Sequence, residues 1–310
     1  MKIGLNLPTW PRRDGTWASW TGIRRLALRA EAMGVDTLWV PDHLQRETAS
    51  RGMFGFHECW TILTATAEAT SRIGIGPFIA CTGFRNPALL AKMAMTLDEV
   101  SGGRLVLGLG SGVPERDPSW RAFGFDTARP IRRYAESAEV VTRLLRETAP
   151  LTFDGELVRT AGAELIPRGP RPSGIPVLMA GAGERTLSIA ARFGDLVNVN
   201  RPLVSPGDAR GVVAAAGAAC EAIGRDPSTL AVTGWARLAI GDDGVAPARE
   251  GWLAGDPATV AETVHAMEDE GIAHLTVYPA TVDDPSPHPA LTDETLDRFE
   301  PFLEAVRTGS

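Results

Sequence analysis

Strand-like and helix-like segments alternate along this chain from end to end. Short apolar runs typical of buried strands occupy residues 2–7, 36–41, 72–80, 104–107, 175–181, 195–200, 230–240 and 273–279. Each is followed by a segment with apolar residues at helical spacing, at 18–33, 59–70, 87–100, 130–147, 184–193, 209–223, 257–270 and 293–307. Eight consecutive strand–helix units with no linker predict a single (β/α)8 TIM barrel domain over residues 1–310.

The segment 86–112, NPALLAKMAMTLDEVSGGRLVLGLGSG, shows one such unit in detail. Pro87 favours a helix start, and Ser101-Gly102-Gly103 ends the helix. The run 104–107 predicts a short strand covered on both faces. The glycine-rich stretch after it lets the backbone approach a ligand closely, at the strand end where α/β proteins usually bind ligands.

Three connections are long and are expected to be irregular, at 45–56, 113–129 and 150–174. The first two follow strands directly, which places them as insertions on the C-terminal rim of the barrel. Long rim insertions usually form the walls or lids of a site. The third follows a helix, and the pattern does not place it.

Composition and charge exclude several classes of protein. The net charge of −7, with no basic stretch, argues against nucleic acid as a partner. Cys59, Cys81 and Cys220 have neither paired nor zinc-type spacing, which favours a reducing cytoplasm. The N-terminus enters a strand at once and no apolar run could span a bilayer, so we expect neither a signal peptide nor membrane association.

Asp42 and His43 stand at the end of the second predicted strand, on the rim where barrels carry catalytic groups. Histidine is the side chain best suited to moving protons near neutral pH, so His43 is a candidate acid–base group. The alternative is a structural histidine that caps the following loop. His57 and Glu58 could join this pair in a metal site, but the spacing matches no metal motif, and Glu58 equally fits a helix cap. We therefore predict no metal.

The third predicted strand ends in FIACTGF, which puts two small side chains, Cys81 and Thr82, at the rim. They suit contact with a ring system, although a buried cysteine behaving as a small hydrophobe is an equal alternative. Two glycine clusters follow strands, at 108–112 and 181–186. The second opens a helix, whose free N–H groups make an anion site. Neither is a dinucleotide fingerprint, and together they indicate a phosphorylated ligand.

These segments resemble the luciferase-like monooxygenase superfamily, in the branch of bacterial oxidoreductases that use coenzyme F420 or a reduced flavin. The resemblance runs in order through GLNLP, AEAMGVDTLWVPDHL, HECWTILTATAEATSRIGIG, FRNPALLAKMAMTLDEVSGGRLVLGLGSG, PVLMAGAGERTLSIAARFGDLVNVN and GDPATVAETVHAMEDEGIAHLTVYP. It implies a (β/α)8 barrel with rim insertions, a flavin-type cofactor at the strand ends, and a homodimer.

The resemblance also implies roles for individual residues. His43 would lie beside the cofactor ring and transfer a proton, with Asp42 next to it. Gly181, Ala182 and Gly183 would grip the phosphate. The strand exit from Phe78 through Ile79 and Cys81 to Thr82 would back the ring, with a non-proline cis peptide near Phe78-Ile79. Ser111 and Gly112 complete the expected cofactor set.

One departure from the superfamily pattern concerns the residue after the GxGxG run. Several relatives carry Glu or Trp there, and the Glu donates a proton in the sugar-phosphate dehydrogenases. This chain has Val113, with Glu115 two residues later, so sugar-phosphate oxidation is not expected. A second proton-transfer group is left unassigned.

The leading functional prediction is coenzyme F420-dependent hydride transfer to or from a small organic substrate. The alternative is a two-component FMN-dependent monooxygenase that uses oxygen and a separate flavin reductase. A third possibility is a non-catalytic flavin-binding barrel. The site is expected to be apolar, and eight aromatic residues near strand ends or insertions are candidate walls: Trp10, Trp17, Trp20, Phe54, Phe56, Trp60, Trp120 and Trp235.

Overall fold

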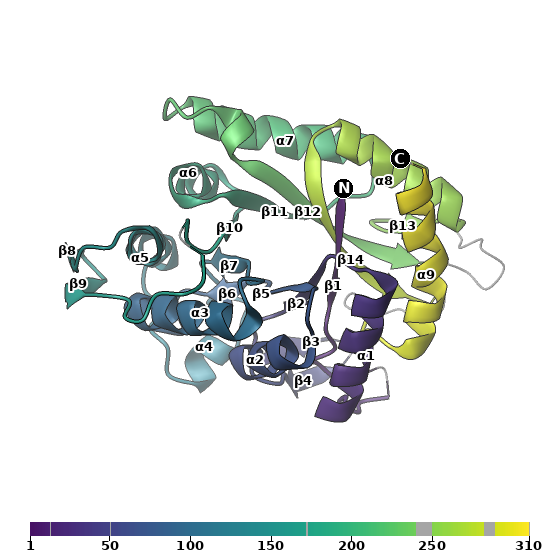
Figure 1. The fold of residues 1–310 in the computed structure, drawn as a ribbon, viewed down its shortest axis with the longest axis horizontal. Helices are drawn as coiled ribbons and strands as arrows, with labels where there is room; N and C mark the ends of the chain where they lie inside the picture. The colour runs from purple at the N-terminus through teal and green to yellow at the C-terminus, as the bar shows by residue number, and fades with distance from the viewer. Residues whose placement is uncertain (13, 50, 172, 240–249, 282–288, 310) are drawn as a thin grey trace.

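Parallel strands form a barrel in the computed structural model, which describes residues 1–310 except 13, 50, 172, 240–249, 282–288 and 310 (Figure 1). Along the sheet the order is β5-β2-β1-β14-β12-β11-β10-β7-β6. The strands are β1 (Lys2–Asn6), β2 (Thr37–Val40), β5 (Gly74–Pro77), β6 (Ala80–Cys81), β7 (Leu107–Gly110), β10 (Val177–Ala180), β11 (Leu196–Pro202), β12 (Ala231–Ala239) and β14 (Ile272–Ala280).

The ring closes at the third barrel position, where β5 and β6 follow one another. β5 pairs with β2, β6 pairs with β7, and a parallel bridge between Ile75 and Leu105 joins the two edges. Between β5 and β6 the Phe78-Ile79 peptide is cis, at the position the resemblance implies. The predicted TIM barrel is therefore confirmed, with its third strand divided into two pieces.

Helices follow the strands and surround the barrel (Figure 1). They are α1 (Trp20–Met33), α2 (Cys59–Ala69), α3 (Pro87–Ser101), α5 (Pro130–Arg146), α6 (Glu184–Phe193), α7 (Pro206–Glu221), α8 (Pro257–Asp269) and α9 (Asp293–Thr308). Their ends follow local signals: the Asn86 side chain caps α3, and Gly34 and Gly102 end α1 and α3 in the left-handed conformation. No helix in the described ranges is long and apolar enough to cross a membrane.

The fourth barrel strand lies later than predicted. Residues 104–107 were expected to form it, but β7 begins at Leu107 and runs through the glycines to Gly110. A Cβ on Gly108 would lie 2.2 Å from the carbonyl oxygen of Pro77, and one on Gly76 would lie 2.2 Å from that of Val106. These two glycines therefore serve the close approach of β5 and β7 rather than a ligand.

The long connections contain regular structure, so the expectation that they are irregular was wrong. In the first connection, β3 (Gln45–Thr48) and β4 (Gly52–Gly55) pair as an antiparallel hairpin, and in the third β8 (Leu151–Asp154) and β9 (Arg159–Ala163) do the same. The segment 113–129 includes the short helix α4 (Ser119–Ala122), and β13 (Leu253–Ala254) pairs with β12. These elements are short, and the hairpins carry little of the apolar alternation that predicts strands.

Candidate active site

A cleft of about 880 Å³ opens at the carboxyl ends of the barrel strands. Its walls come from strands β6, β7, β10, β11, β12 and β14, from the segments that follow β1, β2, β5, β7 and β10, and from the β3–β4 hairpin. This is the face on which (β/α)8 barrels carry their active sites, and the volume suits a cofactor together with a small substrate.

The structure brings ten of the eleven predicted site residues to this cleft: Asp42, His43, Phe78, Ile79, Cys81, Ser111, Gly112, Gly181, Ala182 and Gly183. Thr82 is the exception. Its side chain is buried, its hydroxyl donates to the carbonyl oxygen of Gly110 at 3.0 Å, and the residue lines a separate, smaller groove. The hydrogen bond to Gly110 in β7 therefore directs the Thr82 side chain away from the cleft that the other ten residues line.

His43 is paired with a residue that the sequence did not single out. Its Nδ1 lies 2.9 Å from Oδ2 of Asp117, and the His43 side chain is 31% exposed while that of Asp117 is 6% exposed. Burial would raise the pKa of Asp117, but hydrogen bonds from His43 and Ser119 outweigh it and lower the pKa. The carboxylate is thus ionised and can only accept, so Nδ1 carries a proton, and in the neutral imidazole Nε2 is the basic nitrogen.

The Asp117 carboxylate is itself held in place. The backbone N–H of Ser119 donates to its Oδ1 at 2.9 Å. The Ser119 hydroxyl makes two hydrogen bonds to the backbone of Gln45. It accepts from the Gln45 N–H at 3.0 Å and donates to the Gln45 carbonyl oxygen at 2.9 Å. The loop after β7 is therefore tied to the β3–β4 hairpin beside the histidine. No partner for Nε2 of His43 is found among the described residues, and this side chain lines the cleft.

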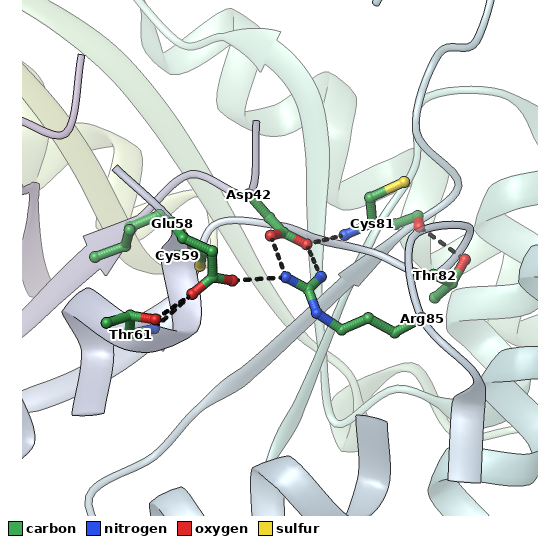
Figure 2. A network of polar contacts seen from close by, with 9 residues as sticks. Asp42, Glu58, Cys59, Thr61, Cys81, Thr82 and Arg85 are labelled. Carbon is green, nitrogen blue, oxygen red and sulfur yellow. Dashed lines mark hydrogen bonds and ion pairs between the residues drawn. The ribbon is translucent and has the colours of Figure 1, made fainter. Parts of the chain in front are cut away.

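Asp42 faces a different set of partners, shown in Figure 2. Its two oxygens accept a bidentate pair from Arg85 at 2.6 and 3.0 Å, and Oδ2 also accepts from the backbone N–H of Cys81 at 2.9 Å. Burial raises the pKa of Asp42, and the Arg85 guanidinium opposes that rise. Because these three donors come from β6 (Cys81) and from the loop before α3 (Arg85), the Asp42 carboxylate connects the end of β2 to both segments.

The neighbouring polar side chains are also engaged in structural contacts. Glu58 accepts from the backbone N–H of Thr61 at 2.7 Å, which confirms it as a helix cap, and its other oxygen receives Arg85 at 2.9 Å (Figure 2). Nε2 of His57 bonds the carbonyl oxygen of Ala18 at 2.9 Å. Within the part of the chain that the structure describes, no group of three or more potential ligands could hold a metal ion.

Cys81 lines the cleft as a small neutral side chain. Burial is the main cause that raises its pKa to about 12, so the thiol stays protonated near neutral pH and is a poor nucleophile. A side chain of this size leaves room for a flat ring. Gly112 packs directly against this thiol: its φ is +67°, and a Cβ there would meet the sulfur of Cys81 at 2.7 Å. Glycine is therefore required at 112 by both conformation and packing.

The loop after β10 fits the expected phosphate site. Gly183 is the N-cap of α6 and has no side-chain oxygen that could accept from the N–H groups of the first turn, while its own N–H donates to the hydroxyl of Thr186 at 3.2 Å. Backbone N–H groups in the first turn of a helix that receive no side-chain cap are suited to an anion. A Cβ on Gly183 would meet nothing within 4 Å, so open space lies next to this turn.

Aromatic rings form a continuous wall on the opposite side of the cleft. The ring centroids of His43 and Phe56 are 5.4 Å apart, those of Phe56 and Trp10 are 6.1 Å apart, and Tyr278 lies 6.5 Å from Trp10. Trp235 meets Tyr278 edge-on at 5.9 Å. Four of the eight predicted wall residues line the cleft, namely Trp10, Phe54, Phe56 and Trp235. Of the others, Trp17 and Trp20 are exposed, and Trp60 and Trp120 are buried outside the cleft.

Comparisons with known proteins agree with this architecture. Over 175 residues the chain is 32% identical to the 5,10-methylenetetrahydromethanopterin reductase of Archaeoglobus fulgidus, covering 56% of this chain and 48% of that enzyme. The chain thus spans about half the length of this relative. It is 30% identical over 285 residues to the F420-dependent hydroxymycolic acid dehydrogenase of Mycobacterium tuberculosis, covering 89% of this chain and 77% of that enzyme.

Solved structures share the fold at lower identity. An F420-dependent secondary alcohol dehydrogenase, in complex with an F420-acetone adduct, superposes with a TM-score of 0.78 at 18% identity, covering 99% of each chain. The family model for luciferase-like monooxygenases matches residues 1–251. By its sequence and its fold, the chain belongs to the luciferase-like monooxygenase family.

Proposed function

We propose that this protein is a coenzyme F420-dependent oxidoreductase that transfers a hydride to or from a small organic substrate. The observation that carries the proposal is the His43–Asp117 pair, which opens onto the same cleft as the first turn of α6. A proton-transfer group and a phosphate site in one cleft of this volume suit hydride chemistry with a phosphorylated deazaflavin. Support comes from relatives that are named as F420-dependent enzymes.

The residues in the cleft fit such a cofactor. The cis turn at Phe78-Ile79, together with Cys81, Ser111 and Gly112, would bound its ring, and Gly181 to Gly183 with the first turn of α6 would hold its phosphate. When bound, coenzyme F420 supplies a two-electron hydride carrier. The protein's part is to orient the two reactants and to exclude water.

His43 would exchange the proton that accompanies the hydride. Asp117 fixes Nδ1–H, so Nε2 is the atom that takes up or releases this proton in the cleft. We assign Asp42 a positioning role instead, since Arg85 and the N–H of Cys81 engage both its oxygens. Val113 lines the cleft at the position where several relatives carry a proton-donating Glu, so this position has no acid. We therefore assign the acid–base function to His43, oriented by Asp117.

The second candidate is a two-component FMN-dependent monooxygenase. The name of the matched family favours it, and a cleft of this size with an aromatic wall would also take FMN. This reading requires a separate flavin reductase as partner. In either case we propose a single-domain, homodimeric bacterial enzyme of the cytoplasm, as inferred from the sequence.

A binding titration tests the proposal. Purified protein is titrated with oxidised coenzyme F420 and, separately, with FMN, and binding is followed by absorbance and fluorescence. Tight binding of F420 with weak FMN binding supports the deazaflavin reading. A preference for FMN, above all in its reduced form, moves the assignment to the monooxygenase. If neither binds, the protein is not a flavin-type oxidoreductase.

A further inference from the structure

One polar side chain of the cleft has no part in the site described so far. Asn198 lies on β11, is 2% exposed and lines the cleft. Its Nδ2 donates to Oγ1 of Thr233 on the neighbouring strand β12 at 3.1 Å. Its Oδ1 has no hydrogen-bond partner among the residues that the structure describes, so this carbonyl oxygen is open to the cleft.

Thr233 fixes which end of the Asn198 amide faces the cleft. The Thr233 side chain is buried, and its hydroxyl donates to the carbonyl oxygen of Val197 at 3.2 Å. A hydroxyl has only one proton, so Oγ1 of Thr233 must accept from Asn198. Turning the amide over would place its oxygen against Oγ1 with no proton between them, unless the hydrogen bond to Val197 broke. The carbonyl oxygen of Asn198, rather than its NH2 group, is therefore presented to the cleft.

Asn198 lies between the proposed phosphate loop and the aromatic wall. On one side it pairs with Ala180, the last residue of β10 before the glycine loop. On the other side it pairs with Thr233, and Trp235, the next residue on the same face of β12, belongs to the aromatic wall. A ligand group at Oδ1 would thus be close to both.

Asn198 and His43 stand on opposite sides of the cleft. His43 follows β2, Asn198 lies on β11, and three barrel positions separate these two strands in either direction round the ring. A substrate that one end fixes at Oδ1 would therefore extend across the cleft toward His43, the proposed proton-transfer group.

The chemistry of Oδ1 limits what it can bind. A carbonyl oxygen only accepts hydrogen bonds, so its partner must bring an O–H or N–H group. A phosphate or a carboxylate brings acceptors and does not suit this point, although the proposed phosphate loop is next to it. A donor on a ligand would satisfy an oxygen that the protein leaves without a partner on an almost fully buried side chain.

We propose, resting on the function proposed above, that the substrate carries a hydroxyl or N–H group on an apolar body, and that Oδ1 of Asn198 accepts a hydrogen bond from this group. The apolar body would pack on the aromatic wall beside Trp235. Asn198 then selects for substrates with a donor, and Thr233 is a positioning residue that keeps the NH2 group of the amide away. A carbonyl or ether oxygen in the same place would face Oδ1 with no proton to share.

The test measures binding of three small probes that share one bicyclic frame. Indole brings an N–H donor, 1-indanone brings a carbonyl acceptor, and indene brings neither. The full-length protein is titrated with each probe by calorimetry, with and without saturating coenzyme F420 or FMN. The variants are Asn198→Leu, which removes the amide, and Thr233→Val, which keeps the amide but removes the group that fixes its orientation. The affinity of each variant for both cofactors is measured in parallel.

Each variant has a matched control. Asn200 is two residues further along the same face of β11 and lines the cleft, but it is exposed and no hydrogen bond to another described residue fixes its amide, so Asn200→Leu controls for the loss of an amide. Thr142 is buried on α5, outside the cleft, where its hydroxyl donates to the carbonyl oxygen of Ala138 at 2.7 Å. Thr142→Val therefore controls for the loss of a buried hydroxyl.

We expect the wild type and both controls to bind indole about three- to tenfold more tightly than indene, and 1-indanone no more tightly than indene, whether or not the cofactor is bound. Asn198→Leu should bind indole and indene alike. In Thr233→Val the amide can turn, so 1-indanone should gain about threefold and the preference for indole should fall. Cofactor affinity should change by less than about twofold in all variants.

Several outcomes would overturn the inference: equal binding of indole and indene by the wild type, a preference for indole that survives in Asn198→Leu, or its loss in Asn200→Leu. A preference that disappears once the cofactor is bound, together with weaker cofactor binding by Asn198→Leu, would show that Oδ1 binds a hydroxyl of the cofactor and would reject the assignment to the substrate. An unchanged order of probes in Thr233→Val would reject the positioning role. Binding of indole that depends on Asn198 in a protein that binds neither cofactor would sustain this inference and reject the proposed function.

Discussion

Nδ1 of His43 lies 2.9 Å from Oδ2 of Asp117, a residue 74 positions later in the chain. The contact joins the end of β2 to the loop after β7 and fixes which ring nitrogen carries the proton. His57 makes the opposite arrangement, because its Nε2 bonds the carbonyl oxygen of Ala18, which can only accept. When the rings are neutral, the two histidines should therefore be opposite tautomers, with the proton on Nδ1 in His43 and on Nε2 in His57.

Replacing Asp117 with Asn should disturb the tautomer of His43 alone. The Asn side-chain amide can donate as well as accept, so Nδ1 of His43 can be either protonated or unprotonated in this contact. The distance and orientation of the two side chains should change little. Nitrogen-15 NMR of the imidazoles measures this: the signals of His43 should shift toward a mixture, and those of His57 should not move. In a hydride-transfer assay the variant should lose about tenfold or more in kcat, part of the 10²- to 10⁴-fold that acid–base catalysis contributes. An unchanged His43 spectrum in Asp117→Asn would show that the contact does not set the tautomer.

Removing Arg85 should destabilise the fold strongly. The Asp42 side chain is fully buried, and Arg85 supplies two of its three hydrogen bonds, so Arg85→Met leaves a buried carboxylate without its countercharge. Breaking a buried pair from one side costs about 3–5 kcal/mol. Urea denaturation followed by circular dichroism measures the free energy of unfolding.

The matched control for Arg85 is Arg159→Met. Arg159 pairs with Asp154 at 3.0 Å on the surface, with exposed side-chain fractions of 75% and 85%. Exposed pairs contribute about 0–1 kcal/mol. Equal losses in the two variants would contradict the structural role of the Asp42–Arg85 pair.

Glu31 should make the stability of the protein pH-dependent in acid. Its carboxylate accepts the backbone N–H groups of residues 71, 72 and 73 at 2.8, 2.7 and 3.1 Å, just before β5. Burial acts to raise the pKa of Glu31, but these donors outweigh it and hold the pKa below its ordinary value of 4.5. The stabilisation is therefore complete above about pH 4.5 and is lost as the pH falls through the lowered pKa.

Glu31→Gln should cost about 1–3 kcal/mol at neutral pH, because the amide is a weaker acceptor and brings its own donor. Because Gln does not titrate, the stability of this variant should also fall less than that of the wild type below pH 4.5. Chemical denaturation at several pH values measures both effects, with Glu139→Gln on the half-exposed face of α5 as the control. Parallel stability–pH curves for wild type and Glu31→Gln would rule out this carboxylate as a source of the acid sensitivity.

Features that depend on a few neighbouring residues could be predicted from the sequence. The bounds 184–193 of α6 agree with the prediction, and the starts of α2, α3, α5, α8 and α9 also agree, because caps, prolines and glycines act within one turn. The strand–helix alternation was likewise enough to predict the barrel. The glycine strand β7 was misplaced because it has few side chains from which a strand pattern can be read.

Features that depend on distant contacts could not be predicted in this way. Asp117 has no local signal apart from its place in a long rim insertion, and its partner is 74 residues away. Asp42 was predicted to lie beside His43 at the catalytic rim, but its hydrogen bonds to Arg85, 43 residues later in the chain, have no local signal. Thr82 has the right position in the chain, yet its hydroxyl bonds β7. Each of these depends on which strands become neighbours when the barrel closes.

The start of α6 offers a variant in which stability and cofactor affinity should move in opposite directions. Gly183 is an N-cap with extended backbone and open space around it, so Gly183→Asp fits without strain and supplies the missing side-chain cap. It should stabilise the protein by a few tenths of a kcal/mol, since Asp is a better cap than Gly. The same carboxylate would repel an anion at the first turn of α6 and would use the N–H groups that the proposed cofactor phosphate needs.

Gly183→Asp should therefore weaken binding of coenzyme F420 or FMN by about tenfold or more while the midpoint of unfolding rises slightly. Gly183→Asn is the matched control, because Asn caps the helix without adding a charge, so it should weaken cofactor binding less than Asp does. Thermal unfolding and fluorescence titration measure the two effects on the same samples. If Gly183→Asp binds the cofactor as tightly as the wild type, the phosphate is held elsewhere, since an added negative charge at this turn cannot be neutral toward an anion bound to it.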